Sequence, residues 1–306
     1  MKIPKISIII LNWNGKEDTL ECLESLRKLD YPSYEIIVVD NGSSDDSVPI
    51  LRKRFPNIKL IVNDKNLGYA GGNNVGIKYA LKRKADYIFL LNNDTVVHKD
   101  CLRELLDVIE REPKVGFVGP KTYHYQEPKR IQFIGGSYSF ITGRSSYIGS
   151  GEIDHGQHDE LREVDFINGH ALLVRKEVID SIGMLDPEYF AYNEETDWCI
   201  RAKGKNYKCL YVPRAIVWHK SSKSSCGLTR PYLITRNQLL FMRKNASKRQ
   251  LMIFFLHFFL VQTTHRMLSF LKHRQWDKLK VFVQAVGWNF GLWKDNNPLT
   301  QMLKEK

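Results

Sequence analysis

The stretch "YIFLLNNDTVV", residues 87–97, joins a strand to a polar tip. Its run of apolar and aromatic residues predicts a strand that is buried on both faces. The run ends in two asparagines, Asp94 and a threonine. Ligands of open, parallel sheets bind beyond the carboxyl ends of the strands. Asp94 is therefore the first residue in which we expect a functional role.

Apolar runs of strand length alternate with helical patterns on either side of this stretch. The expected strands are residues 5–11, 35–40, 58–63, 87–92 and 115–119. Apolar residues spaced three and four apart predict helices over 17–29 and 75–84. This order predicts an α/β fold with a mostly parallel, doubly wound, Rossmann-like sheet.

The second half of the chain is expected to complete this domain and then change character. Residues 120–165 are rich in Gly, Ser and Tyr, which indicates a variable insertion or a hairpin. Residues 166–219 predict a strand, a helix, a loop, another helix and two short strands. We therefore expect one α/β domain over 1–220, with halves 1–100 and 101–220, and a basic helical region over 221–306.

The composition is that of a folded protein, with 43% hydrophobic and 26% charged residues. The net charge of +12 is unevenly spread, because residues 1–200 carry 25 Lys+Arg and 31 Asp+Glu, whereas residues 201–306 carry 21 and 3. The basic third predicts an anionic partner, such as lipid headgroups or a phosphorylated substrate. No nucleic-acid-binding motif accompanies the charge, so we expect no nucleic acid partner.

Cysteine usage and the first residues favour the cytoplasm. Five scattered cysteines without a C-x-x-C pair indicate neither a disulfide framework nor a structural zinc site. The apolar stretch near the N-terminus is short and runs into Asn12, so it predicts a first strand instead of a signal peptide.

The C-terminal region contains two apolar helical patterns. Residues 251–261 are apolar except for His257, but this stretch is shorter than the roughly 20 residues that span a bilayer. Apolar residues then recur at helical spacing from Trp276 to Trp293, with lysines between them. An amphipathic helix of this kind lies in a membrane interface, which predicts a protein peripheral to the inner face of the cell membrane. The alternative is that these two helices pack on the α/β domain, or on a second copy of it in a homo-oligomer.

Six motifs occur in a fixed order along about 215 residues. They are "ISIIILNWNG", "IIVVDNGSSDDS", "NLGYAGGNNVGI", "LLNNDT", "NGHALLVRKEVIDSIGMLDPEYFAYNEETDWCIRA" and "VWH". Together they resemble the family 2 inverting glycosyltransferases, and most closely the rhamnosyltransferase-like branch that serves cell-surface polysaccharide assembly. The resemblance implies a GT-A fold, a dTDP- or UDP-sugar donor, Mn²⁺ or Mg²⁺, and a lipid-linked or glycan acceptor.

The resemblance gives Asp94 and His219 the role of metal ligands. A metal ion that bridges the donor diphosphate neutralises charge as the diphosphate leaves, and hard oxygen ligands suit magnesium or manganese. The family often has two carboxylates where this chain has Asn92, Asn93 and Asp94. This difference implies weak metal binding until the donor adds its own oxygens. Asp94 as a turn cap and His219 as a core or surface histidine are the alternatives.

The donor site is expected at the ends of the first four strands. Asp40 matches the family position that binds the base or ribose. The further candidates are Asn12, Asn14, Gly71, Gly72, Asn73, Asn93 and His170. For Asn12 and Asn14, a role in a turn formed by "NWNG" is the alternative. Gly71, Gly72 and Asn73 are expected in a loop before a helix, where backbone amides approach an anion or simply form a cap.

Glu195 falls where the family's catalytic base is usually Asp, and neighbouring Glu194 is a second candidate. Such a base removes the proton from the acceptor hydroxyl while the hydroxyl attacks opposite the leaving group. Asp197 and Arg201 are four residues apart, so we expect an ion pair along one helix. Two other functions stay open: a non-catalytic GT-A module, and a nucleotidyltransferase, although "NWNGKEDT" lacks the glycine-rich, basic loop of the latter.

Overall fold

The computed structural model describes residues 3–221 and 227–292. The chain divides into two compact units. The N-terminal unit comprises Met1–Ser137, Tyr147–Phe190 and Glu194–Ser222, and the C-terminal unit comprises Tyr138–Ser146, Ala191–Asn193 and Lys223–Lys306. Two short segments from within the first 220 residues thus belong to the C-terminal unit.

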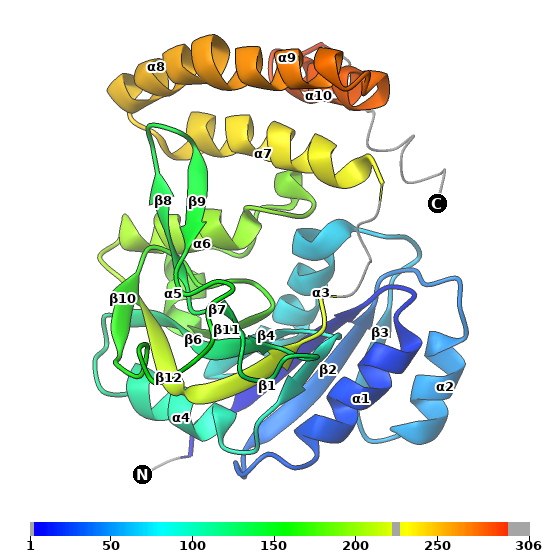
Figure 1. Cartoon of the computed structure of the whole chain (residues 1–306). Helices are drawn as coiled ribbons and strands as arrows, with labels where there is room; N and C mark the ends of the chain where they lie inside the picture. Colours follow the sequence, from blue (N-terminus) through cyan, green and yellow to red (C-terminus); the bar gives the residue numbers. More distant parts are fainter. Residues whose placement is uncertain (1–2, 222–226, 293–306) are drawn as a thin grey trace. The chain divides into compact units, whose positions relative to one another are not determined.

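The N-terminal unit is built on one sheet in the order β10-β12-β6-β11-β4-β1-β2-β3 (Figure 1). Its central strands are β1 (Ile6–Asn12), β2 (Tyr34–Asp40), β3 (Lys59–Val62), β4 (Tyr87–Asn92), β6 (Val115–His124) and β11 (Ala171–Arg175). β1 pairs in parallel with β2 and β4, and β2 pairs in parallel with β3. Only β11 interrupts the central run, because it is antiparallel to both β4 and β6. The mostly parallel α/β sheet expected from the sequence is confirmed.

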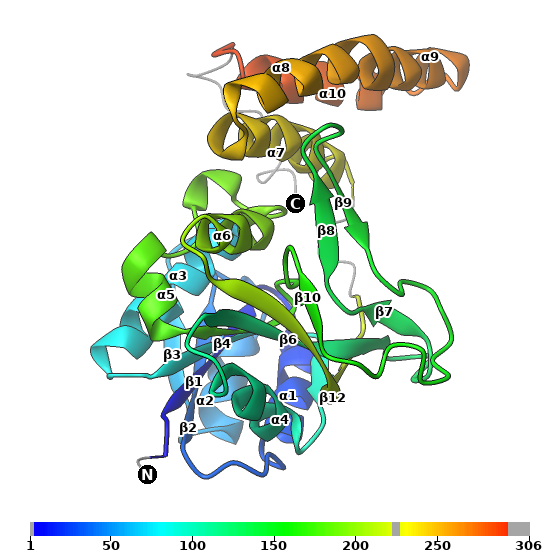
Figure 2. The same cartoon turned by 90° about the vertical axis from the view of Figure 1, so that its left-hand side faces the viewer.

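Helices cover both faces of the sheet, as Figures 1 and 2 show. On one face lie α1 (Lys16–Leu26), α2 (Ser47–Arg54) and α4 (Cys101–Ile109); on the other lie α3 (Gly68–Lys82), α5 (Lys176–Ile182) and α6 (Glu194–Lys203). Successive residues of β1 point to opposite faces of the sheet. Ile8 lies in the core under α1, α2 and α4, and Ile9 lies in the core under α3, α5 and α6. This explains why the strands are apolar throughout instead of alternating.

Helix α3 starts earlier than the sequence predicted. The loop expected around residues 68–76 is wrong, because Gly71, Gly72 and Asn73 lie inside the helix. A Cβ atom on Gly72 would lie 2.4 Å from Leu11 Cδ1. Close packing of α3 on β1 therefore outweighs the low helix propensity of glycine.

The strand that carries His219 also differs from expectation. The two short strands predicted there are one twelve-residue strand, β12 (Lys208–His219), which runs parallel to β6 with a bulge between Val212 and Ile216. β10 (Arg162–Val164) pairs with its beginning and β5 (Thr95–Val97) with its end. The bulge lets one strand serve both pairings.

The hairpin expected within residues 120–165 is confirmed. β7 (Ile131–Phe133) folds back on β6, and β8 (Gly136–Ser139) pairs with β9 (Arg144–Tyr147) in a separate two-stranded sheet. The tip of this hairpin belongs to the C-terminal unit.

The C-terminal unit is mainly helical. It contains α7 (Thr229–Asn245), α8 (Lys248–His257), a π-helical segment (Phe258–Thr263), α9 (Thr264–Lys272) and α10 (Trp276–Trp288). The helix expected from Trp276 is present, whereas Trp293 lies outside the described residues. The segments from α8 to α9 follow one another as one helical run of 25 residues, longer than the eleven-residue apolar stretch that the sequence singled out.

Candidate active site

Asp94 and His219 come together where β4 and β12 end. Asp94 lies between β4 and β5, and His219 pairs with Thr95 of β5. His219 Nε2 lies 3.1 Å from Asp94 Oδ1. The backbone N–H of Lys220 also donates to the carbonyl oxygen of Asp94, at 2.9 Å. Strand pairing thus brings together two residues that are far apart in the sequence.

Gln132, from β7, orients the imidazole of His219. His219 Nδ1 lies 2.7 Å from Gln132 Oε1, an acceptor, so Nδ1 carries the hydrogen and Nε2 faces Asp94. The Gln132 amide nitrogen is in turn bound to Ser221 Oγ and lies 3.3 Å from His124 Nδ1. Partners of this kind fix the tautomer and ring orientation of metal-binding histidines. No sequence motif had indicated a role for Gln132.

His170 supports the same ring from the other side. The two imidazoles stack with centroids 4.9 Å apart. His170 is buried, and both of its nitrogens have partners: Thr122 Oγ1 at 2.7 Å and Asn168 Oδ1 at 2.6 Å. Burial, aided by repulsion from His219, holds the pKa of His170 well below its usual value. His170 is therefore a neutral ring that packs against His219.

The geometry of this pair fits two protein ligands of one hard cation. Neighbouring ligands about 2.1 Å from an octahedral ion are about 3.0 Å apart. The observed 3.1 Å matches that edge. Within residues 3–221 and 227–292, no group of three or more His, Cys, Asp or Glu side chains could hold a metal. An ion at this place would therefore have two such side chains as ligands and would take its remaining ligands from other groups, such as substrate oxygens.

A second polar cluster surrounds Asp40 at the end of β2. Asp40 is buried, and its carboxylate accepts hydrogen bonds from Asn12 Nδ2 at 2.8 Å and from the backbone N–H of Ser43 at 3.0 Å. Asn12 Oδ1 accepts from Thr19 Oγ1 at 2.8 Å. The Asn12 side chain is thus occupied by the protein, and it holds the Asp40 carboxylate in place.

Asn14 and Asn93 tie this cluster to its neighbours. Asn14, whose φ is +51°, accepts hydrogen bonds from the backbone N–H groups of Ser44 and Asp45. Asn93 Nδ2 donates to Thr19 Oγ1 at 3.0 Å. The turn after β1 is therefore connected to the loops after β2 and β4, the strand ends where the sequence placed the donor site.

The first turn of α3 uses its amides within the protein. The N–H of Gly68 donates to Asn66 Oδ1, and the N–H of Ala70 donates to the carbonyl of Phe190. Asn73 is buried and its side-chain amide donates to the carbonyl of Tyr69. The structure thus places Gly71, Gly72 and Asn73 in a packed helix and not in an open, anion-binding loop.

Glu194 and Glu195 open helix α6 together. Burial raises the pKa of the half-buried Glu195 to about 7, against hydrogen bonds from backbone N–H groups that favour the carboxylate. Burial and the neighbouring Glu195 raise the pKa of Glu194 well above its usual value, and Glu194 Oε2 has no hydrogen-bond partner. The ion pair expected between Asp197 and Arg201 is present, at 2.7 Å. Of the two glutamates, Glu195 is the one that ionises near neutral pH.

Tyr69 contacts the chain beside His170 and also interacts with the charges of Glu194 and Glu195. Its hydroxyl donates to the carbonyl of Gly169, next to His170. Burial and the negative charges of Glu194 and Glu195 raise the pKa of Tyr69 well above its usual value. The start of α6 therefore lies within electrostatic range of a residue that contacts the chain beside the Asp94 and His219 cluster.

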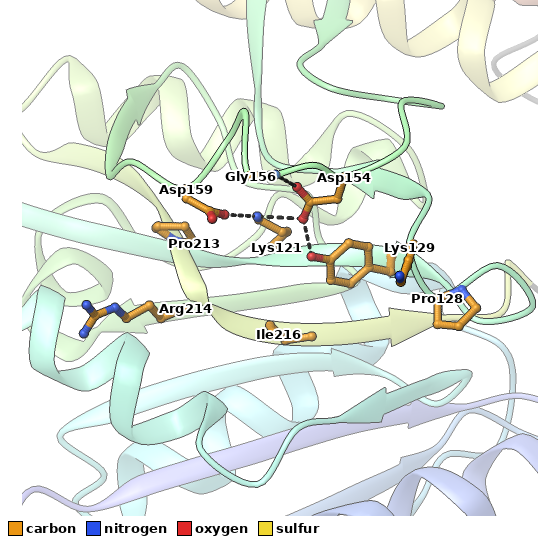
Figure 3. Close-up of a pocket in the computed structure, with 10 residues that line it drawn as sticks. Lys121, Pro128, Lys129, Asp154, Gly156, Asp159, Pro213, Arg214 and Ile216 are labelled. Carbon is orange, nitrogen blue, oxygen red and sulfur yellow. Dashed lines mark hydrogen bonds and ion pairs between the residues drawn. The ribbon is translucent and has the colours of Figure 1, made fainter.

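A separate pocket of about 630 Å³ lies against β6 and β12 (Figure 3). It is lined by Lys121, Tyr123 and Ile216, which alternate along the strands with residues of the His219 face. Lys121 Nζ at its base is bound by Asp154 at 2.8 Å and by Asp159. Among the described residues that line the pocket, none is a predicted site residue. The charge of Lys121 is already neutralised by these two carboxylates.

The model of one protein family, Glycosyl transferase family 2, matches residues 7–183. The chain belongs to this family. The matched residues include every strand from β1 to β11. The resemblance to family 2 that was read from the ordered motifs is thereby confirmed.

Three relatives have names that refer to sugar transfer or glycan synthesis. The low-salt glycan biosynthesis hexosyltransferase Agl10 of Haloferax volcanii is 29% identical over 212 residues, which cover 66% of this chain and 62% of the relative. A poly-beta-1,6-N-acetyl-D-glucosamine synthase of Staphylococcus epidermidis is 26% identical over 74% of this chain and 52% of its own. The N-acetylglucosaminyl-diphospho-decaprenol L-rhamnosyltransferase of Mycobacterium tuberculosis is 26% identical over 62% of this chain and 67% of its own. The first two matches thus span less than two thirds of the relative.

Solved structures that superpose on this chain confirm the GT-A fold. A mannosyltransferase of Pyrobaculum calidifontis in complex with GDP-Man and Mn²⁺ superposes with a TM-score of 0.59 at 14% identity, over 100% of this chain and 80% of that one. Residues 1–349 of Staphylococcus aureus TarS give 0.57 at 19% identity, over 92% and 81%, and TarS has also been solved with UDP-GlcNAc. At these identities the likeness concerns the fold alone.

Proposed function

We propose that this family 2 enzyme inverts the configuration of a sugar as it moves it from a nucleoside-diphosphate-sugar to a hydroxyl group of a lipid-linked or polysaccharide acceptor. The observation that carries the proposal is the 3.1 Å pairing of Asp94 with His219 at the ligand-binding edge of the sheet. The names of two relatives support a lipid-linked or polysaccharide acceptor, because one transfers rhamnose to a diphospho-decaprenol and the other makes a polysaccharide.

Asp94 and His219 would hold Mn²⁺ or Mg²⁺. Such an ion supplies positive charge that stabilises the departing diphosphate. Two protein ligands suffice when substrate phosphates complete the coordination, as is usual for magnesium. The Mn²⁺ in the mannosyltransferase complex supports this assignment. The chain's own contribution is to fix the two ligands before the donor arrives, His219 through Gln132 and Asp94 through the pairing of β5 with β12.

Asp40 would bind the base or ribose of a dTDP- or UDP-sugar. Asn12 and Ser43 fix its carboxylate and leave lone pairs free to accept hydrogen bonds from the donor. The UDP-GlcNAc complex of TarS supports this donor class. The further residues proposed on the donor side are Asn14, Gly71, Gly72, Asn73, Asn93 and His170. They would support the donor site from behind: Asn14 and Asn93 through the turn after β1, Gly71, Gly72 and Asn73 through the packing of α3 on β1, and His170 through the ring of His219.

Glu195 would act as the catalytic base. With a pKa of about 7 it is ionised in a large share of molecules at neutral pH and is still basic enough to take a proton from a hydroxyl group. Inversion by direct displacement requires one such base, because the hydroxyl attacks in one step from the face opposite the leaving group. The start of helix α6 also favours the carboxylate form through the helix dipole.

Residues 1–220 would form the catalytic domain, and 221–306 would keep the enzyme at the inner face of the cell membrane as a peripheral protein. A lipid-linked acceptor is found there. The basic charge of the C-terminal third supports this location, because cytoplasmic leaflets are anionic.

A donor screen tests the proposal directly. Purified enzyme is incubated with a panel of nucleotide sugars and Mn²⁺, and release of nucleoside diphosphate is measured. We expect turnover of one dTDP- or UDP-sugar, and NMR of the product should show the opposite anomeric configuration. A product with retained configuration contradicts direct displacement. Donor binding without any turnover would instead indicate a non-catalytic GT-A module.

A further inference from the structure

The helical run Lys248–Lys272 in the C-terminal unit is long and apolar enough to cross a membrane by length and composition. A core helix of a soluble protein passes the same test, but such a helix is mostly buried. Only 17% of the 18-residue apolar stretch within this run is buried. Its exposed surface therefore requires a separate explanation.

One face of the run packs within the C-terminal unit. Phe254, Phe258 and Gln262 are buried. Gly143, at the tip of the hairpin, packs so closely on Phe254 that a Cβ atom would lie 2.6 Å from its ring. Gln262 Nε2 donates to the carbonyl of Thr142 at 2.8 Å. This face is therefore committed to the rest of the unit.

The other face is also apolar. Met252, Leu256 and Leu260 lie four residues apart, on one line along the helix, and are 60%, 57% and 71% exposed. The further exposed large hydrophobic residues among the described residues of the unit are Ile141, Leu228, Ile234, Ile253, Phe259, Val261, Met267, Leu268, Leu271, Trp276, Val283, Phe290 and Leu292. A surface helix in water normally turns a polar face outward. A concentration of exposed apolar residues marks an interaction site.

The positive charge of the C-terminal unit indicates what kind of partner its exposed apolar face binds. Residues 227–292 contain eleven Lys and Arg against one acidic residue, Asp277. Lys248 and Arg249 begin the run, and Lys272 ends it. Basic residues beside an apolar helical face bind anionic lipid headgroups while the apolar side chains enter the acyl region. A second copy of the same surface is a poorer partner, because two such basic surfaces repel each other.

The packing also selects how the helix meets the membrane. A spanning helix would carry its packed face into the hydrocarbon together with the polar groups bound to it, Gln262 and Gln238 among them. Arg266 Nη1 donates to Thr235 Oγ1 on α7 at 3.2 Å, which commits a charged group to the same side. Polar groups at membrane depth are costly. A helix that lies flat avoids this cost.

We propose that the C-terminal unit is a monotopic membrane anchor, in which the line Met252, Leu256 and Leu260 lies flat in the headgroup and acyl boundary of an anionic bilayer. The binding comes from apolar side chains that enter the acyl region and from lysines and arginines that contact the headgroups. The anchor works independently of sugar transfer, so its test neither needs nor affects the catalytic proposal.

Flotation of the full chain with vesicles tests the anchor. We expect the protein to float with vesicles of phosphatidylcholine and phosphatidylglycerol, and to float less with phosphatidylcholine alone. Leu256→Glu with Leu260→Glu should lower the vesicle partition coefficient about a hundredfold, because two apolar side chains lose their burial. The matched control is Gln250→Glu with His265→Glu, which adds the same two charges at exposed positions off the line. The control should float nearly as the wild type does.

Circular dichroism establishes that all variants are equally helical. If the leucine variant still floats as the wild type does, the proposed face is wrong. Equal flotation with neutral vesicles would contradict the role of charge. A wild-type dimer in buffer that the leucine variant converts to a monomer would show that a second copy covers this face and would overturn the proposal.

The orientation has its own measurement. Nitroxide labels are placed one at a time on cysteines from residue 252 to residue 268 of the vesicle-bound protein, and their collision rates with oxygen are measured. A flat helix gives immersion that rises and falls with the helical period of about 3.6 residues. A spanning helix gives one maximum near its middle on every face, and that result would overturn the monotopic arrangement.

Discussion

The Nε2 atom of His219 lies 3.1 Å from Oδ1 of Asp94, and the pairing of β12 with β5 brings them there. The two residues sit at the ends of different strands, and a glutamine from a third strand orients the histidine. Each group can therefore be removed separately while the strands that carry it stay paired. This allows the proposed metal site to be tested by binding measurements as well as by activity.

Removal of either proposed ligand should weaken Mn²⁺ binding. Asp94→Asn and His219→Gln each keep the side-chain size and delete a metal ligand. We expect the Kd for Mn²⁺ in the presence of UDP to rise at least about tenfold, measured by EPR of free Mn²⁺. Asp64→Asn, an exposed carboxylate on a loop, is the control and should leave the Kd unchanged. An unchanged Kd in both site variants would place the ion elsewhere.

Gln132 should act as a positioning residue for His219. Gln132→Leu removes the acceptor that faces His219 Nδ1, so the ring loses its fixed tautomer and orientation. Loss of such partners costs about 10- to 100-fold in metal affinity. Gln132→Glu keeps an acceptor oxygen at the same reach and should restore most of the affinity. If the leucine variant binds Mn²⁺ as tightly as the glutamate variant, Gln132 has only a packing role.

Transfer activity should depend on the ionisation of Glu195. The base must be deprotonated, and burial raises its pKa to about 7. The kcat/KM should therefore rise about tenfold between about pH 6 and pH 8, because the ionised fraction rises from about a tenth to about nine tenths. Glu195→Gln should lower kcat by about 10²- to 10⁴-fold while donor binding persists. Near-normal turnover in Glu195→Gln would exclude it as the base.

Glu194 should affect stability instead of transfer. Its pKa is raised on folding by burial and by Glu195. A carboxyl group with a raised folded pKa stabilises the fold fully below its unfolded pKa, and this contribution is lost as pH rises through the folded pKa. Glu194→Gln cannot ionise, so its Tm should exceed that of the wild type by an increasing margin as the pH is raised. Thermal unfolding at a series of pH values measures this margin.

The activity of the same variant separates the two glutamates. Because burial favours the protonated form of Glu194, the amide is a close substitute, and Glu194→Gln should retain most of the wild-type kcat. A loss of transfer as large as that of Glu195→Gln would move the base assignment to Glu194. A Tm margin that is constant with pH would contradict the buried, protonated state of Glu194.

Local sequence patterns determined the sheet and the identity of most strand-end residues. Continuous apolar runs such as residues 87–92 form strands because helices cover both faces, and this requirement is visible residue by residue. The ordered motifs also placed Asp40 and Asp94 at strand ends, where the structure has them. The extent of α3 was not predictable in this way. Its glycines disfavour a helix locally, and only contact with Leu11 and Ile9 on β1 explains them.

The sequence by itself determined that this chain is a family 2 glycosyltransferase with an aspartate at the tip of a central strand. The tertiary structure alone decided that Gln132 orients His219 and that His170 stacks beneath it. It also decided that one face of Lys248–Lys272 is packed and the other exposed. The physical reason is range: apolar periodicity and turn chemistry act between near neighbours, whereas hydrogen bonds and burial depend on residues that only the folded chain brings together.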